Sequence, residues 1–221
     1  NYYNKQNLTF LKTNKKKINF NNNLLNYKKN QSPIGQKIIV CGKVFNTRGI
    51  PLPDIFIEIW QANASGKYRD KNDKHNAPLD PNFFGGGSTL TNKNGEYKFY
   101  TIIPGAYPWS NHNNAWRPKH IHFSLISSNY FSRLNTQMYF PNDVLLNDDP
   151  IFNSVEKRFR DKLIANFDNK KNNITNFISY KFNIIMPWVT KKKIHATPSQ
   201  TVGPFFGNYL NFDKKKFPFQ E

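Results

Sequence analysis

Apolar and polar residues alternate in several short stretches of the chain, which is the pattern of β-strands with one buried face. Within residues 55–60, for example, isoleucine occupies every second position. Strands are predicted at residues 36–45, 55–60, 120–126, 134–140 and 177–185. The dipeptide Asn94-Gly95 joins residues 88–91 to residues 96–103 and predicts a β-hairpin, because Asn-Gly suits a tight turn with positive φ.

Helical periodicity is nearly absent, and residues 152–167 are the best helix candidate. Short strands separated by turns predict an all-β fold: an antiparallel β-sandwich core, or a barrel, with long loops and one short helix. The loop at 61–87 contains Gly85-Gly86-Gly87, and a loop of this length in a compact domain is usually functional. We expect an N-terminal arm at 1–35, a catalytic domain at 36–190 and a tail at 191–221.

The charge of the chain raises the question of nucleic-acid binding. The 221 residues include 32 Lys and Arg but only 14 Asp and Glu, which gives a formal net charge of +18. Only 6 of the basic residues are Arg, while Asn is the commonest residue at 33, so the charge follows an excess of residues with AT-rich codons. The lysine runs cluster toward the two ends, and no basic–aromatic module for stacking bases is evident. A basic nucleic-acid-binding sandwich therefore stays only as an alternative, and we expect no nucleic-acid partner.

Two further classes are excluded by simple counts. No stretch approaches the ~18 consecutive apolar residues of a membrane-spanning helix, so no membrane partner is expected. No secretory signal is visible, and the single cysteine, Cys41, allows neither an internal disulfide nor a cysteine-based zinc site. A cytoplasmic location is the default expectation.

His120-Ile121-His122 lies in a predicted strand, where residues two apart face the same way. Both imidazoles therefore project from one face, close enough to hold one metal ion. No cysteine or carboxylate stands near the pair, and the conspicuous oxygen donors are Tyr68 and Tyr107. A phenol ligates strongly only when a Lewis-acidic ion such as Fe³⁺ displaces its proton. The residues alone leave open that both tyrosines simply line a core or a loop.

Longer motifs resolve the choice by resemblance. They are Gly42–Phe45, Ile57–Asn63, Gly66-Lys67-Tyr68, Ala77–Phe83, Thr101–Trp109 and Trp116–Phe123, in this order. From about Pro33 to about Ile185 the chain resembles the intradiol ring-cleaving dioxygenases, in particular the β subunits of the protocatechuate 3,4-dioxygenases. The resemblance implies a β-sandwich with long loops, and a non-haem Fe³⁺ held by two tyrosines and two histidines.

The resemblance also implies site residues and an activity. The iron ligands would be Tyr68, Tyr107, His120 and His122, with Tyr107 leaving the metal when a catechol-type substrate binds. Arg117 and Gln137 would act in catalysis, and Trp109 and Ile151 would line the substrate pocket. The implied reaction is cleavage of protocatechuate by O₂ to 3-carboxy-cis,cis-muconate.

The two ends of the chain depart from the β-subunit pattern. The arm at 1–35 is shorter than the family's N-terminal region, which weakens the expectation of a carboxylated catechol. Residues 196–221 instead resemble the start of the α subunit, which in the family reaches into the β active site. Substrate-pocket positions carried over from that segment are Thr201, Gly203, Pro204 and Phe205. The expected partners are an α-subunit-like chain or further copies of this chain, and the alternative is a non-catalytic β-subunit remnant.

Overall fold

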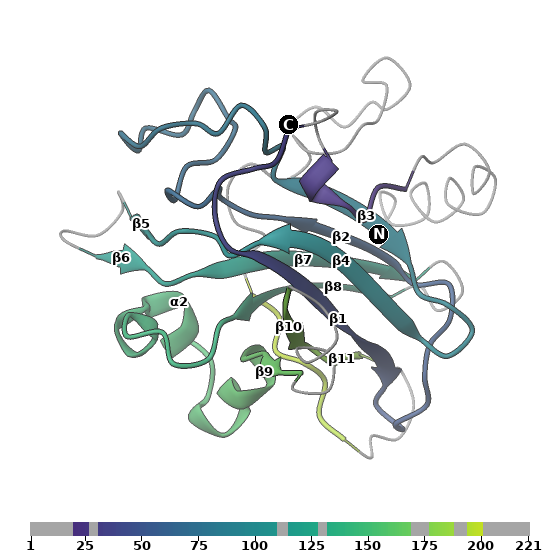
Figure 1. Ribbon diagram of the computed structural model, residues 1–221. Coiled ribbons are helices and arrows are strands. Elements are labelled where there is room, and N and C mark those ends of the chain that lie inside the picture. The colour runs from purple at the N-terminus through teal and green to yellow at the C-terminus, as the bar shows by residue number, and fades with distance from the viewer. Residues whose placement is uncertain are drawn as a thin grey trace.

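The computed structural model describes residues 20–26, 31–109, 115–127, 132–168, 177–187 and 194–200, and its core consists of two β-sheets packed face to face (Figure 1). One sheet has the order β11 (Ile184–Met186), β1 (Lys37–Asn46), β10 (Ile178–Lys181) and β9 (Asn166–Phe167), with β4 (Glu96–Ile102) on the other edge of β1. The second sheet has the order β3 (Gly86–Leu90), β2 (Phe56–Trp60), β7 (His120–Ser127) and β8 (Ser132–Tyr139). A two-stranded ribbon pairs β5 (Tyr107–Pro108) with β6 (Trp116–Arg117).

Alternating apolar residues from both sheets form the core between them. Ile57 and Ile59 of β2 are buried there, with Phe123 of β7 and Phe99 of β4. Burying such side chains stabilises the fold by about 1.5–3 kcal/mol each. The predicted all-β class with long loops is confirmed. The opposite face of β2 and β7 carries Trp60 and His122, and it is this face that holds the site described below.

The sheet around β1 is mixed and not purely antiparallel as predicted. Strand β1 pairs antiparallel with β4, but its other edge pairs in parallel first with β10 and then with β11. Parallel neighbours need a long connection, and here the chain forms β2 to β9 between β1 and β10. The alternation of apolar residues in 177–185 predicts a strand but carries no information about its direction.

The hairpin predicted at Asn94-Gly95 is wrong, although the turn itself forms. The Gly95 N–H donates to the Asn92 oxygen (2.9 Å) and Gly95 has φ +72°. The two strands that it joins do not pair, because β3 pairs with β2 while β4 pairs with β1. The turn therefore leads the chain from one sheet of the sandwich to the other.

The helix predicted at 152–167 is also wrong. The α-helix α2 covers Pro150–Asn153, 3-10 helices cover η2 (Leu146–Asp148) and η3 (Lys157–Leu163), and β9 follows. Glu156 has φ −52° and ψ 132°, which breaks the helical path. The Arg160 guanidinium then donates to the carbonyl oxygens of Asn153 and Val155 (both 2.8 Å). These two hydrogen bonds replace the helical backbone bonds that the oxygens would otherwise accept.

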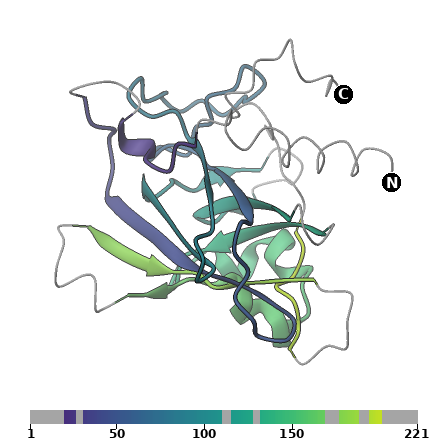
Figure 2. The ribbon, with the colours of Figure 1, turned by 90° about the vertical axis from the view of Figure 1, so that its right-hand side faces the viewer.

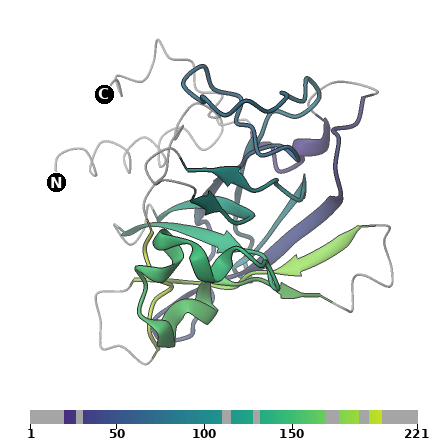
Figure 3. The same ribbon diagram turned by 90° about the vertical axis from the view of Figure 1, so that its left-hand side faces the viewer.

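The connections gather at two sides of the sandwich. The long loop between β2 and β3 lies at one side, and α2 and η3 lie at the other (Figures 2 and 3). A last short element, η1 (Leu24–Asn26), packs on β4, and Leu24 and Leu25 are buried in the core. The proposed division into arm, domain and tail stays a prediction. Within the described ranges, no helix is both long and apolar enough to cross a membrane.

Replacing Gly42 with alanine is expected to lower the free energy of unfolding by about 1–3 kcal/mol. A Cβ at this position of β1 would lie 1.9 Å from the carbonyl oxygen of Phe182, which accepts a hydrogen bond from the Tyr97 hydroxyl. The backbone must therefore move to accommodate it. Urea unfolding measures the loss, and Lys98→Ala on the exposed face of β4 is the control, with a change within about 0.5 kcal/mol. Equal stability of both variants would contradict the close packing at Gly42.

Candidate metal centre

Two histidines and two tyrosines meet on the outward face of the second sheet. His120 and His122 lie two apart at the start of β7, so both rings project from the same face, and both are buried. The Tyr107 hydroxyl lies 3.2 Å from His120 Nε2, and the Tyr68 hydroxyl lies 3.2 Å from His122 Nε2. The structure thus brings together all four residues that the resemblance implied as metal ligands.

The long loop after β2 carries Tyr68 to this place. Gly66 has φ +81°, and a Cβ there would lie 2.2 Å from the carbonyl oxygen of Ala106, so the loop touches the backbone that leads into β5. The Tyr68 N–H then donates to the Asp73 carboxylate (2.7 Å), which fixes the backbone at the tyrosine. The Tyr68 ring consequently meets the Tyr107 ring edge-on, with centroids 5.5 Å apart.

Both imidazoles are neutral and present Nε2 toward the tyrosines. Burial, and then the nearby Arg117 guanidinium, lower the pKa of His120 and of His122 well below the ordinary value. His120 Nδ1–H donates to the Pro118 oxygen (2.7 Å), which leaves the Nε2 lone pair for a ligand. The His122 ring is stacked on Trp60, with centroids 4.9 Å apart and planes 4° apart, so its orientation is also fixed.

This donor set fits a hard trivalent cation. Burial raises the pKa of Tyr107, and only a strongly Lewis-acidic ion would displace the proton of such a phenol near neutral pH. Two phenolate oxygens and two neutral imidazole nitrogens suit Fe³⁺ by charge and by ligand type. The described residues hold no cluster of three or more His, Cys, Asp or Glu side chains suited to a metal, so a metal here needs the phenols.

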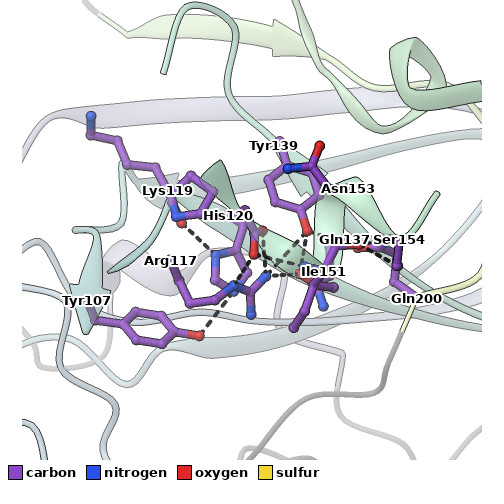
Figure 4. Close-up of polar contacts among 12 residues, drawn as sticks. Tyr107, Arg117, Lys119, His120, Gln137, Tyr139, Ile151, Asn153, Ser154 and Gln200 are labelled. Atoms are coloured by element: carbon purple, nitrogen blue, oxygen red, sulfur yellow. Dashed lines mark hydrogen bonds and ion pairs between the residues drawn. The ribbon is translucent and has the colours of Figure 1, made fainter. Parts of the chain in front are cut away.

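Arg117 lies beside the four residues and is held in a buried network (Figure 4). The guanidinium is 2% exposed and forms a two-pronged ion pair with Asp149, with Nε–Oδ1 at 3.0 Å and Nη2–Oδ2 at 3.1 Å. Nη2 also donates to Gln137 Oε1 (2.7 Å) and to the Tyr139 hydroxyl oxygen (3.3 Å). Its pairing across the ribbon with Tyr107 places it next to that tyrosine.

The other expected pocket residues divide into two groups. Trp109 follows β5, with its N–H donating to the Ala115 oxygen (2.8 Å), and Ile151 in α2 is half-buried beside Asp149. Their role in a substrate pocket stays a prediction. Four expected positions lie outside the described residues: Thr201, Gly203, Pro204 and Phe205.

Sequence reasoning missed Asp149 and Tyr139, which hold Arg117 in place. Asp149 is fully buried, and it also accepts from the Ile151 N–H (3.1 Å) as the N-cap of α2. The only local signal was Asp149-Pro150, a cap followed by proline at the first helical position. Tyr139 lies two residues after Gln137 on β8, so strand alternation predicts that both face the same side.

A buried carboxyl group on the same sheet face makes stability depend on pH. Glu58 of β2 is 4% exposed, and burial raises its pKa from 4.5 to about 8, although the Arg133 charge opposes the shift. Its neighbours on this face are Ser88 of β3 and Ser124 of β7. The folded chain therefore keeps a proton that the unfolded chain releases, and the contribution of Glu58 to stability falls as the pH rises from about 4.5 through about 8.

Glu58→Gln is expected to remove this loss of stability. Urea midpoints at pH 5 and pH 8 measure it: from pH 5 to pH 8 the midpoint of Glu58→Gln should rise relative to that of the parent chain, because the buried His120 and His122 affect both chains equally. Glu156→Gln, on the exposed surface, is the matched control and should behave as the parent chain does. Parallel curves for the parent chain and Glu58→Gln would contradict the shifted pKa.

Comparison with known proteins places this geometry in a family. The sequence model of the family described as "Dioxygenase" matches residues 13–187. The protocatechuate 3,4-dioxygenase beta chain of Burkholderia cepacia is 50% identical over 158 residues, which is 72% of this chain and 67% of that one. The protocatechuate 3,4-dioxygenase alpha chain of Pseudomonas putida is 32% identical over 68% of this chain and 71% of its own length.

Solved structures share the fold. The 3-chlorocatechol 1,2-dioxygenase of Rhodococcus opacus 1CP superposes with a TM-score of 0.55 and 25% identity, over 71% of this chain and 62% of that one. The catechol 1,2-dioxygenase of Acinetobacter sp. ADP1 gives the same score and identity, over 74% and 56%. Together with the family match over most of the chain, these relatives establish that the chain belongs to the intradiol ring-cleaving dioxygenase family.

Proposed function

We propose that this chain cleaves the ring of protocatechuate (3,4-dihydroxybenzoate) with O₂ to give 3-carboxy-cis,cis-muconate at a non-haem ferric site. Tyr68, Tyr107, His120 and His122 would hold the ion. The observation that carries the proposal is the meeting of two phenol oxygens with two neutral Nε2 atoms, each pair 3.2 Å apart, in a buried place. Bound Fe³⁺ would supply the Lewis acidity that ionises a catechol and activates its ring toward O₂.

The two phenols differ in ways that suit different roles. Tyr68 is buried and its backbone is held by Asp73, so it serves as a fixed ligand. Tyr107 is half-buried on the short ribbon, and its hydroxyl contacts His120 Nε2. The Tyr107 oxygen in its ionised form is therefore suited to accept a proton from a catechol hydroxyl.

Arg117 supplies a permanent positive charge beside the reacting ring. Its Nε and Nη2 are occupied by Asp149, Gln137 and Tyr139, and Nη1 makes no hydrogen bond within the described part of the chain. Nη1 is therefore the donor available to substrate oxygen. A fixed guanidinium in a site with little water stabilises the negative charge that develops on the substrate more strongly than water does. The Trp60 ring, stacked on His122, helps to keep water away from the proposed metal ligands.

The 50% identical relative, which is the β chain of a protocatechuate 3,4-dioxygenase, supports the proposed substrate and the proposed partner. An α chain of the same enzyme is also a relative. We propose that this chain assembles with an α-subunit-like chain or with copies of itself. Size-exclusion chromatography of the chain alone, and then with an added α chain, distinguishes the two.

The decisive experiment is optical and uses the full chain reconstituted with Fe³⁺. A broad visible band from phenolate-to-iron charge transfer is expected, and it should shift when protocatechuate is added without oxygen. Admission of O₂ should then consume one O₂ per ring and yield 3-carboxy-cis,cis-muconate. Catechol without the carboxylate serves as the comparison substrate.

Each other outcome excludes part of the proposal. A colourless protein after reconstitution would exclude the ferric site. A coloured protein that consumes no O₂ with either substrate would identify a non-catalytic member of the family. Faster turnover of catechol than of protocatechuate would reassign the substrate and leave the iron chemistry intact.

A further inference from the structure

The segment 194–200 is held on the domain of its own chain by hydrogen bonds from its backbone and from the Thr197 side chain. Thr197 pairs with Ile185 of β11 in both directions: its N–H donates to the Ile185 oxygen and its Oγ1 accepts from the Ile185 N–H, both at 2.9 Å. Farther along, the Pro198 oxygen accepts from Thr136 Oγ1 (2.9 Å), and the Gln200 N–H donates to the Asn135 oxygen (2.9 Å). These bonds lead the segment along β8 toward the Arg117 network.

The side chain of Gln200 ends inside that network. It is 7% exposed and bonded at both ends of its amide, because Oε1 accepts from the Tyr139 hydroxyl (2.9 Å) and Nε2 donates to the Ile151 oxygen (3.2 Å) (Figure 4). A carbonyl oxygen can only accept, so the contact with Ile151 fixes which end of the amide faces Tyr139. The orientation of Gln200 is thereby set by its surroundings.

Hydrogen-bond capacity shows why Gln200 matters to Arg117. The Tyr139 hydroxyl has one proton and two amide oxygens within reach, Gln137 Oε1 at 3.0 Å and Gln200 Oε1 at 2.9 Å. Burial raises the pKa of Tyr139, so this proton is present throughout the working pH range. When Gln200 takes the proton, Gln137 Oε1 is left to the Arg117 guanidinium. The Tyr139 oxygen then also turns a lone pair toward Arg117 Nη2, which lies 3.3 Å away.

We propose that Gln200 is a positioning residue for Arg117: the segment 194–200 docks on its own domain, and Gln200 orients the guanidinium through Tyr139. The proposal rests on the proposed function in one respect, that Arg117 contacts the substrate. Docking and orientation are properties of the folded chain alone. Two experiments separate these parts.

The first experiment is a double-mutant cycle in the full-length, iron-free chain. Gln200→Leu and Tyr139→Phe remove the two partners of one hydrogen bond, and each is expected to lower the urea midpoint. The double variant should fall no further than the more affected single variant, because the shared bond can be lost only once. Ser199→Ala is the matched control for the coupling: its hydroxyl donates one exposed hydrogen bond to the Asn135 oxygen (3.2 Å) and does not bond Tyr139, so its midpoint shift should add to that of Tyr139→Phe. Additive midpoint shifts of Gln200→Leu and Tyr139→Phe would overturn the docking.

The second experiment measures steady-state kinetics of the iron-loaded chain with protocatechuate. Gln200→Leu is expected to lower kcat about tenfold with little change in KM, since one hydrogen bond of about 1.4 kcal/mol, which is equivalent to tenfold, orients a group that acts in the transition state. The visible band of the resting enzyme should be unchanged, because Gln200 touches none of the four ligands. Arg117→Lys should lower kcat further, and adding Gln200→Leu to it should have no effect.

The outcomes of the two experiments are distinguishable. An unchanged kcat in Gln200→Leu, or a full tenfold loss on top of Arg117→Lys, would overturn the positioning role. If the parent chain turns over no catechol, the proposed function fails, and the cycle in the iron-free chain still decides whether Gln200 is coupled to Tyr139. Ser199→Ala should keep the parent kcat in every case.

Discussion

Tyr68→Phe is expected to abolish the visible band and to lower the affinity for Fe³⁺. The loss should exceed about 100-fold, because mutating a residue that only hydrogen-bonds a metal ligand already lowers metal affinity by about 10–100-fold. The substitution removes one phenol oxygen, 3.2 Å from His122 Nε2, and leaves the ring in its buried place. The remaining donors carry one negative charge less, which disfavours a trivalent ion. Titration with Fe³⁺, followed by absorbance and by iron analysis after gel filtration, measures the loss.

The control for this prediction is a tyrosine that is remote from the site. Tyr100→Phe on β4, in the other sheet, should leave both the band and the iron content at the values of the parent chain. Circular dichroism and the urea midpoint show whether Tyr68→Phe is folded. A folded Tyr68→Phe chain that keeps its iron and its colour would exclude Tyr68 as a ligand.

The metal-site geometry was predictable only where one strand carries it. His120 and His122 share a face because any strand places residues two apart on the same side. Tyr68 and Tyr107 stand on separate elements, and nothing in the spacing of the sequence places them within 3.2 Å of those histidines. The resemblance to a family named them, and the folded loop with its close approach at Gly66 brings them there.

The errors in the fold have the same origin, because local patterns do not fix partners. Asn94-Gly95 forms its turn, but the pairing of the strands on either side depends on their other possible neighbours. Here β3 pairs with β2, and β4 pairs with β1. At 152–167 the apolar spacing resembles a helix, yet Arg160 satisfies the carbonyl oxygens of Asn153 and Val155 and so allows the helix to end. Both outcomes are decided by contacts distant in sequence.

Asp149→Ala is expected to lower the free energy of unfolding by about 3–5 kcal/mol, because it leaves the Arg117 guanidinium buried without a counter-charge. Arg117 is 2% exposed and Asp149 is 0% exposed, so water cannot replace the lost carboxylate without a rearrangement. The same change removes the side chain that caps α2 through the Ile151 N–H, which adds to the loss. Chemical unfolding of the iron-free chain measures the change, so no catalytic step enters the comparison.

The double variant Arg117→Met with Asp149→Leu separates a buried charge from a loss of packing. Apolar residues of similar size at both positions remove the uncompensated charge, so this chain should be more stable than Asp149→Ala, although neither variant should turn over substrate. Gln137 Oε1 and the Tyr139 hydroxyl can still bond each other at 3.0 Å in the absence of the guanidinium. A double variant as unstable as Asp149→Ala would mean that Asp149 stabilises the fold through the α2 cap and packing, and that the ion pair serves only to aim Arg117 at the substrate.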